Sequence, residues 1–330
     1  MNPLYEAHLQ HASGLKLRAV SARAQGDDGA TVAALLLHEA ERSERRALHA
    51  LGPTDRVTRL RAAVERCGLL VEARDVTTVL SERWPEVLDL ADACGPSAAP
   101  LLARLRPAVE GLAAEYHRVA RDLPEHFPAI PAQAEPDALL RLLAQTRQQA
   151  TLFPGDWRVR LALAQLEGQR GDHEAAWAAV RAARAMAPEA IDGLGVELRV
   201  ALGARDSKRL RSSLDAAAEW LAEGAPSAAL ALHVAAGWAT LAITDPGARA
   251  VAVAEASQAV ARGLAAESTD PLLRRCLRAM GLLIAAVRDG ATPDPSLLVR
   301  AGLHDLAARL DGPADPLTLL RYADPQRAAA

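Results

Sequence analysis

Histidines are the residues best suited to chemistry, and the first pair stands close to the amino terminus. His8 and His11 are three positions apart, with Glu6 nearby. On a helix this spacing places both imidazoles on one face, where they could bind a metal ion. The sequence places no third ligand beside them. We therefore favour two exposed polar side chains and predict no metal site.

Other catalytic patterns do not occur in the sequence. It contains no GxSxG nucleophile motif and no phosphate-binding loop of the GxxxxGK[ST] or GxGxxG kind. His38-Glu39 and His49 do not form the HExxH zinc pattern, and we interpret the charged residues around them as a solvated helix face. His233 lies inside an apolar stretch, where a hydrogen-bonded core histidine is favoured over a ligand. We predict no catalytic residues, no cofactor and no enzyme activity.

The composition indicates which fold class positions these residues. The chain has 330 residues, of which half are hydrophobic and only 3% are aromatic. Alanine, leucine, valine and arginine dominate, and isoleucine occurs only at four positions. A protein rich in β-sheet would use more β-branched and aromatic residues. The composition therefore predicts an all-α protein.

Charge, cysteines and hydropathy restrict the partners and the compartment. The formal net charge is −3, which gives no support for a large nucleic-acid surface. Cys67, Cys94 and Cys276 form no CxxC pair, and the amino terminus lacks an export-signal pattern, so we expect reduced thiols in the cytoplasm. The most apolar stretch, 228–243, is short for a membrane span. We expect it to be a buried helix, and we expect no membrane contact.

A proline-rich segment divides the chain. Four prolines fall within 123–136, and proline removes the amide donor that a helix interior needs. We predict a linker there, with an N-terminal helical region at 1–122 and a second helical region at 137–330. In the first region the predicted helices are 3–25, 30–51, 55–72, 74–83, 85–94 and 97–122.

Asp-Pro pairs recur along the second region. They occur at 245–246, 270–271, 294–295 and 315–316. Aspartate is a strong N-cap, and proline suits the first helical position, so each pair predicts the start of a helix. The spacing indicates a train of antiparallel helices with short connections.

Residues 156–188 carry the best internal repeat. A large-small pair, a turn glycine, small residues and a closing proline follow one another at Leu163, Ala164, Gly171, Ala176, Ala183 and Pro188. This pattern resembles the tetratricopeptide repeat (TPR). The sequence departs from the family at Arg160 and Glu167, because the large aromatic that TPR proteins have on the first helix is missing from these positions. Weaker echoes of the turn follow at Gly203 and Gly247, and none precedes residue 137.

The resemblance implies an α-solenoid of stacked antiparallel helical hairpins, preceded by the N-terminal helical region. In TPR proteins the first helix of each pair builds the concave surface. On this register the inward positions are Arg158, Leu161, Gln165 and Gly168, with Arg199 as the nearest counterpart on the next first helix. Arg158, Gln165 and Arg199 would hold an acidic or C-terminal peptide through charge-assisted hydrogen bonds.

The tryptophans have two interpretations. Trp157, Trp177, Trp220 and Trp238 all lie in the second region. They could anchor a bound peptide, or they could fill gaps between alanine-rich helices, which we favour. Trp157 stands at a helix start and is kept as a candidate partner-binding residue.

These features predict a non-catalytic adaptor or scaffold that binds a peptide or helix of another protein on a concave helical surface. One alternative is a regulatory or sensor protein that gates a nucleic-acid-binding or effector partner. Another is an enzyme with an unrecognised helical active site. The N-terminal region could form a homodimer, cap the array or bind a second partner. Direct nucleic-acid binding is not expected.

Overall fold

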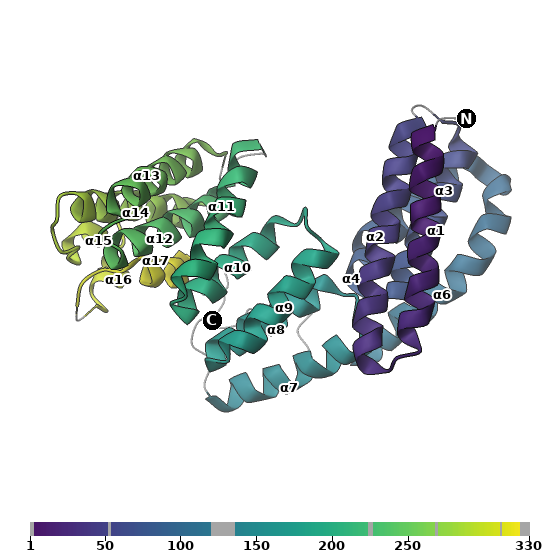
Figure 1. The fold of residues 1–330 in the computed structure, drawn as a ribbon, viewed down its shortest axis with the longest axis horizontal. Helices are drawn as coiled ribbons and strands as arrows, with labels where there is room; N and C mark the ends of the chain where they lie inside the picture. Colours follow the sequence, from purple (N-terminus) through teal and green to yellow (C-terminus); the bar gives the residue numbers. More distant parts are fainter. Residues whose placement is uncertain are drawn as a thin grey trace. The chain divides into compact units, whose positions relative to one another are not determined.

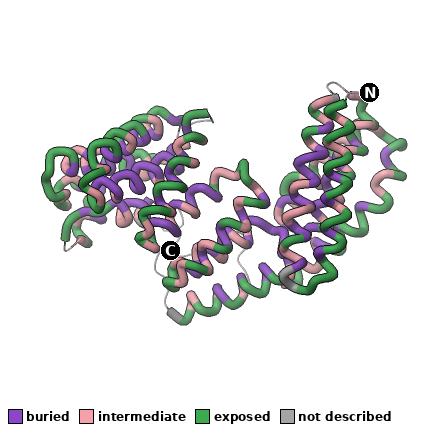
Figure 2. The backbone as a smooth tube through the Cα atoms, in the orientation of Figure 1, coloured by how far each residue is buried: buried purple, intermediate pink, exposed green. Residues whose placement is uncertain are grey.

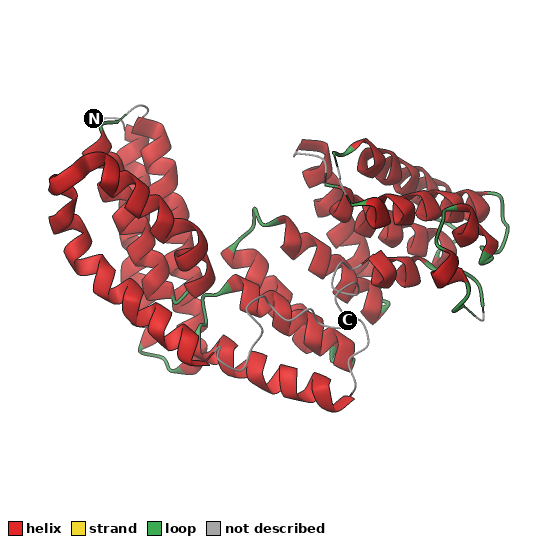
Figure 3. Cartoon of the chain, turned by 180° about the vertical axis from the view of Figure 1, so that it is seen from behind, coloured by secondary structure: helices red, strands yellow, loops and turns green. Residues whose placement is uncertain are grey.

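The computed structural model describes residues 3–51, 54–119, 136–223, 227–267, 270–310 and 312–323. Within these ranges every regular element is helical and none is a strand (Figure 3). The helices form antiparallel hairpins joined by short turns, so the predicted all-α hairpin fold is confirmed. The residues divide into two compact units, which are described separately.

Unit 1 combines the described residues of Met1–Pro128 with Leu140–Leu163 and Arg181–Pro188. The helices predicted in the N-terminal region begin and end within three residues of the predicted bounds, except that the predicted helix 74–83 divides in two. The predicted end of the helix 97–122 lies outside the described residues. Along the chain the elements of this part are α1 (Pro3–Arg23), α2 (Asp27–Leu51), α3 (Arg56–Ala73), α4 (Val76–Thr78), the π-helical turn η1 (Val79–Arg83), α5 (Trp84–Cys94), the 3₁₀ turn η2 (Gly95–Ala98) and α6 (Ala99–Val119). Most of α7 (Pro136–Leu152) follows in the same unit.

The core of unit 1 draws on residues from both sides of the predicted linker. Helix α2 packs between α1 and α3, and α3 also contacts α5 and α6 (Figure 1). Phe153 is fully buried in this core, with its ring 5.8 Å from that of Tyr116 and 5.3 Å from the guanidinium carbon of Arg74. Residues 123–135 of the predicted linker lie outside the described residues, so the predicted domain boundary stays a prediction.

Unit 2 contains Ala164–Val180 and the described residues of Ala129–Leu139 and Glu189–Ala330. Helices α8 (Trp157–Arg170) and α9 (His173–Met186) contribute to both units. The helices that follow are α10 (Ile191–Ala204), α11 (Ser207–Glu223), α12 (Ala228–Thr244), α13 (Arg249–Ala265), α14 (Pro271–Arg288), α15 (Ser296–Arg300), α16 (His304–Ala307) and α17 (Pro316–Ala323).

Helix α12 is the centre of unit 2. It contacts α10, α11, α13, α14 and α17, and twelve of its residues are buried. Figure 2 shows buried positions gathered where helices meet their neighbours. The predicted buried helix at 228–243 is therefore confirmed. No helix in the described ranges combines the length and apolar character needed to cross a membrane.

The same turn closes three helices. Arg74, Gly171 and Arg205 adopt left-handed backbone angles, with φ of 61°, 88° and 54°. An aspartate follows each of them, and its carboxylate accepts the backbone amide three positions later, on Thr78, Ala175 and Arg209 respectively. The predicted turn at Gly171 is confirmed. The predicted turn at Gly203 is wrong, because Gly203 lies within α10 and Arg205 makes the turn.

Two of the four Asp-Pro pairs start a helix as predicted. Asp270 and Asp315 accept the backbone amides of Leu272 and Leu317 at 2.8 and 2.7 Å, and the intervening prolines begin α14 and α17. The pairs at 245–246 and 294–295 come shortly before α13 and α15. Asp245 accepts the amides of Gly247 and Ala248 in the turn before α13, whereas Asp294 accepts the amide of Ser296, the first residue of α15.

Glycine permits the closest helix approach in unit 2. A Cβ atom added at Gly263 on α13 would lie 2.8 Å from Cβ of Ala231 on α12 and 2.9 Å from a methyl group of Leu277 on α14. Real Cβ atoms do not approach other carbons so closely. Three helices therefore meet at this glycine, and no larger residue fits there without a shift.

We expect Gly263→Ala to destabilise unit 2 by about 1–3 kcal/mol, because it overpacks this junction. The matched control is Gly14→Ala on the exposed face of α1, where an added Cβ meets nothing within 4 Å. That change should stabilise the protein by about 0.5–1 kcal/mol, because alanine favours the helix. Urea unfolding followed by circular dichroism measures both. An unchanged midpoint for Gly263→Ala would contradict the close approach.

Candidate functional site

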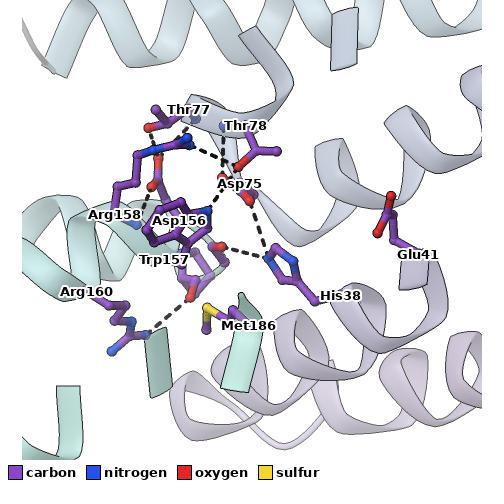
Figure 4. A network of polar contacts seen from close by, with 12 residues as sticks. His38, Glu41, Asp75, Thr77, Thr78, Asp156, Trp157, Arg158, Arg160 and Met186 are labelled. Atoms are coloured by element: carbon purple, nitrogen blue, oxygen red, sulfur yellow. Dashed lines mark hydrogen bonds and ion pairs between the residues drawn. The ribbon is translucent and has the colours of Figure 1, made fainter. Parts of the chain in front are cut away.

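A buried polar network joins α2, α4 and the start of α8 in unit 1 (Figure 4). Its centre is formed by Asp75 and Asp156, whose side chains are fully buried. Both residues are helix caps. Asp75 begins α4 by accepting the amide of Thr78 at 3.2 Å, and Asp156 begins α8 by accepting the amides of Arg158 and Val159 at 3.1 and 3.3 Å.

The two caps interlock. The second carboxylate oxygen of Asp156 accepts the backbone amide of Thr77 at 3.1 Å and also its hydroxyl group. Nε2 of His38 lies 2.9 Å from the carbonyl oxygen of Gly155 and 3.6 Å from a carboxylate oxygen of Asp75. One small cluster thereby fixes three chain segments that are far apart in sequence.

Burial controls the protonation of this pair. It raises the pKa of both carboxyls, and the neighbouring charge of Asp156 raises the pKa of Asp75 further. Hydrogen bonds from Thr77 and Thr78 and the charge of Arg158 act in the opposite direction. The pair therefore keeps protons to a higher pH than exposed carboxylates do.

Two of the predicted partner-binding residues belong to this network. The buried indole of Trp157 donates from Nε1 to the hydroxyl of Thr78 at 3.2 Å. Arg158 donates to the same hydroxyl at 3.2 Å and to Glu82 at 2.8 Å, and its guanidinium carbon lies 4.3 Å from the centre of the Trp157 ring. Leu161 is buried. These side chains make internal contacts, and their role toward a partner stays a prediction.

The other predicted residues lie in unit 2. Gln165 on α8 and Arg199 on α10 are both partly exposed. The two helices are adjacent, because a Cβ atom at Gly168 would lie 4.0 Å from a methyl group of Val200. The structure thus divides the predicted site between the units, with Trp157, Arg158 and Leu161 in one and Gln165 and Arg199 in the other.

The isolated histidine of the apolar helix is half-buried and bonds within its own helix. Nδ1 of His233 donates to the carbonyl oxygen of Ala229 at 2.8 Å, as predicted. Burial, together with the charge of Arg199, lowers the pKa of His233 to about 4. The histidine is therefore neutral at physiological pH. Among the residues that the structure describes, no group of three or more His, Cys, Asp or Glu side chains is placed to hold a metal ion.

The remaining tryptophans also pack in the interior. Trp238 is buried, and Trp177 and Trp220 pack partly buried against the same core of unit 2. Trp177 additionally lies 5.1 Å below the guanidinium carbon of Arg209. The gap-filling interpretation is confirmed for Trp238, and for the partly exposed Trp177 and Trp220 it stays a prediction.

Sequence reasoning missed the polar core of α2. The charged stretch that we predicted as a solvated face contributes His38, Glu41, Arg42, Ser43 and Glu44 to the interior. The expectation is wrong because the partners of these side chains come from distant segments. Arg42, for example, donates to the backbone carbonyls of Ala185 and Met186.

A second charged cluster lies along the same helix. Arg66 on α3 donates to Glu86 on α5 at 2.8 Å. A carboxylate oxygen of Glu41 is 3.9 Å from Arg66 and 3.8 Å from Arg83. The turn η1 links the two clusters, since Arg83 faces Glu41 whereas the preceding residue, Glu82, binds Arg158. The sequence held one signal of this burial. Acidic and basic residues are interspersed in 39–46, and ion pairs between them can compensate for the loss of water around the charges.

The carboxyl pair predicts a specific pH dependence. Because folding raises the pKa of Asp75, its contribution to stability is complete below its ordinary pKa of 3.8 and is lost as the pH rises through the folded value. We expect Asp75→Asn to become more stable relative to wild type as the pH rises from roughly 4 to 8. Chemical denaturation across this range measures the difference.

Asp55→Asn is the matched control for this measurement. Asp55 also caps a helix, but its hydrogen bonds from Thr58 lower its pKa below 3.8. Its contribution is lost only as the pH falls through that lowered value. The variant should track wild type between roughly pH 4 and 8 and diverge below that range. Parallel pH profiles for the two variants would refute the buried pair.

The hydroxyl of Thr78 gives a second prediction. Thr78→Val leaves the buried indole N–H of Trp157 without an acceptor, so we expect a loss of about 1–3 kcal/mol in the free energy of unfolding. Thr151→Val is the control, since Thr151 is exposed and its hydroxyl bonds only locally to Arg147. Thermal and urea unfolding compare them. Equal effects of the two substitutions would argue against the network.

Comparison of the chain with protein-family models, with curated proteins and with solved structures finds no match.

Proposed function

We propose that the protein is a non-catalytic adaptor that holds another protein along a layer of helices in unit 2. The supporting observation is that the first helices of successive hairpins lie side by side. Helix α8 meets α10 at Gly168 and Val200, α10 meets α12 at Gly195 and His233, and α12 contacts α14. Stacked hairpins of this kind create extended binding surfaces.

The second helices pack on these first helices. A Cβ atom at Gly168 would lie 3.9 Å from Cβ of Ala176 on α9, and one at Gly237 would lie 2.8 Å from Leu214 on α11. Helix α13 packs on α12 and α14 through Gly263. Small residues therefore bring the two rows together, which is the packing principle that the sequence resemblance implied.

The spacing of the first two hairpins supports the TPR resemblance. Helices α8 and α10 begin at Trp157 and Ile191, and α9 and α11 begin at His173 and Ser207. Both intervals are 34 residues, and about 34 residues is the length of a TPR unit. The next hairpin departs from this period, since α12 begins at Ala228.

Gln165 and Arg199 supply the polar chemistry of the proposed surface. They stand on neighbouring first helices and are partly exposed. An amide and a guanidinium together suit a carboxylate, which the guanidinium binds through charge-assisted hydrogen bonds. In this proposal the partner presents an acidic or C-terminal segment.

Site-specific photo-crosslinking in the native host tests this surface. A photoreactive side chain at Gln165 of the full-length protein should capture one partner, and Arg199→Glu should abolish the capture. The same group at Ser212, which is exposed on the second helix α11, is the control and should not capture it. Equal capture at both positions, or capture unaffected by Arg199→Glu, would contradict the proposal.

A further inference from the structure

The last helix that the structure describes lies on the first-helix layer of unit 2. Helix α17 contacts α12 and α14, both of which are first helices (Figure 1). Its buried residues are Pro316, Leu319, Leu320 and Ala323. These positions follow the i, i+3, i+4, i+7 spacing by which an amphipathic helix docks in an apolar groove.

The site beneath α17 is apolar. Leu319, Leu320 and Ala323 belong to the same buried cluster as Leu232 of α12 and Ile284 of α14. Without α17, large apolar side chains of two first helices would face water. A surface with this chemistry needs a helical occupant with an apolar stripe.

Helix α17 also has the properties of a separable ligand. It contains eight residues, which is too short for a helix that is stable by itself. The N-cap of α17 comes from the adjoining residue of the same segment, because Asp315 accepts the amides of Leu317 and Thr318. The segment before it is anchored where the amide of Ala314 donates to the carbonyl of Pro293. Short helices with few neighbours open at low free energy.

We propose that the face of α12 and α14 is a binding site for a short amphipathic helix of a partner protein, and that α17 is its internal competitor. This inference rests on the proposed adaptor function and names the partner's chemistry. The partner helix carries two adjacent leucine-sized residues, a small residue or proline three positions before the first of them, and a small residue three positions after the second. The partner binds by displacing α17.

Tethering explains why the site is closed in the free protein. A ligand joined by a short connection has an effective concentration in the millimolar range. A partner helix of equal intrinsic affinity therefore binds the intact chain on the order of 100-fold more weakly than it binds a chain whose α17 is no longer tethered.

Peptide exchange tests the proposal on the full chain. A protease site inserted after the exposed Gly312 allows α17 to be cut loose once the protein has been purified. A fluorescent peptide of residues 313–323 is then titrated by anisotropy. We expect saturable one-to-one binding to the cut protein, and binding on the order of 100-fold weaker to the uncut protein. The peptide with Leu319→Asp and Leu320→Asp should not bind, whereas Thr318→Ser, which lies off the stripe and keeps the hydroxyl bond to Asp315, should bind like the parent.

Three results would overturn the inference. The cut protein could unfold or refuse exchange, which would make α17 a permanent part of the core. The uncut protein could exchange α17 between two copies, which would make a second copy the occupant. In hydrogen exchange on the uncut protein, amides of α17 could be as protected as those of α12 and α14, whereas we expect them to exchange first.

The two proposals fail in different ways. Capture at Gln165 without peptide exchange would support the adaptor function and contradict the proposed helix-binding site on α12 and α14. Peptide exchange without capture at Gln165 would support the helix-binding site on α12 and α14 and contradict the proposed polar binding surface on α8 and α10.

Discussion

Unit 1 depends on one carboxylate that serves two helices. Asp156 caps α8 with one oxygen and binds the amide and hydroxyl of Thr77 with the other. Removing a carboxylate from water is costly, and several well-aligned donors are needed to compensate. The donors come from segments almost 80 residues apart, so the fold is correct only when both are in place. Trp157 and Arg158 owe their positions to this constraint.

The two units achieve specificity by different physical means. In unit 1, buried charges along α2 pair with distant segments, and such pairs define a unique arrangement more than they add stability. In unit 2, alanine and glycine let helices approach closely, so that shape selects the neighbours. The many arginines supply the buried charge pairs of unit 1, and the many alanines allow the close helix packing of unit 2.

Local signals predicted most of the fold. Helix periodicity, Asp-Pro caps and the turn at Gly171 involve residues within a few positions of each other, so the sequence shows them directly. The sequence could not show that Arg205 rather than Gly203 adopts the left-handed turn, because glycine takes that conformation at no steric cost and arginine rarely does. It also could not show that Glu41 and Arg42 are buried, since their partners lie on other helices. Trp157 and Arg158 were predicted to bind a partner, and the sequence could not show their internal acceptor, Thr78, because it is some 80 residues away.

The first-helix layer of unit 2 has two chemically distinct parts. Around α8 and α10 it presents an amide and a guanidinium to solvent, whereas around α12 and α14 it is apolar and covered by α17. A partner that carries an acidic segment next to an amphipathic helix would satisfy both parts. The acidic segment would bind first at the open part, and its tether would then raise the local concentration of the helix toward that of α17. In the proposed mechanism, displacement would be favourable only for a partner that carries both elements, so the covering helix would make binding to the apolar face selective.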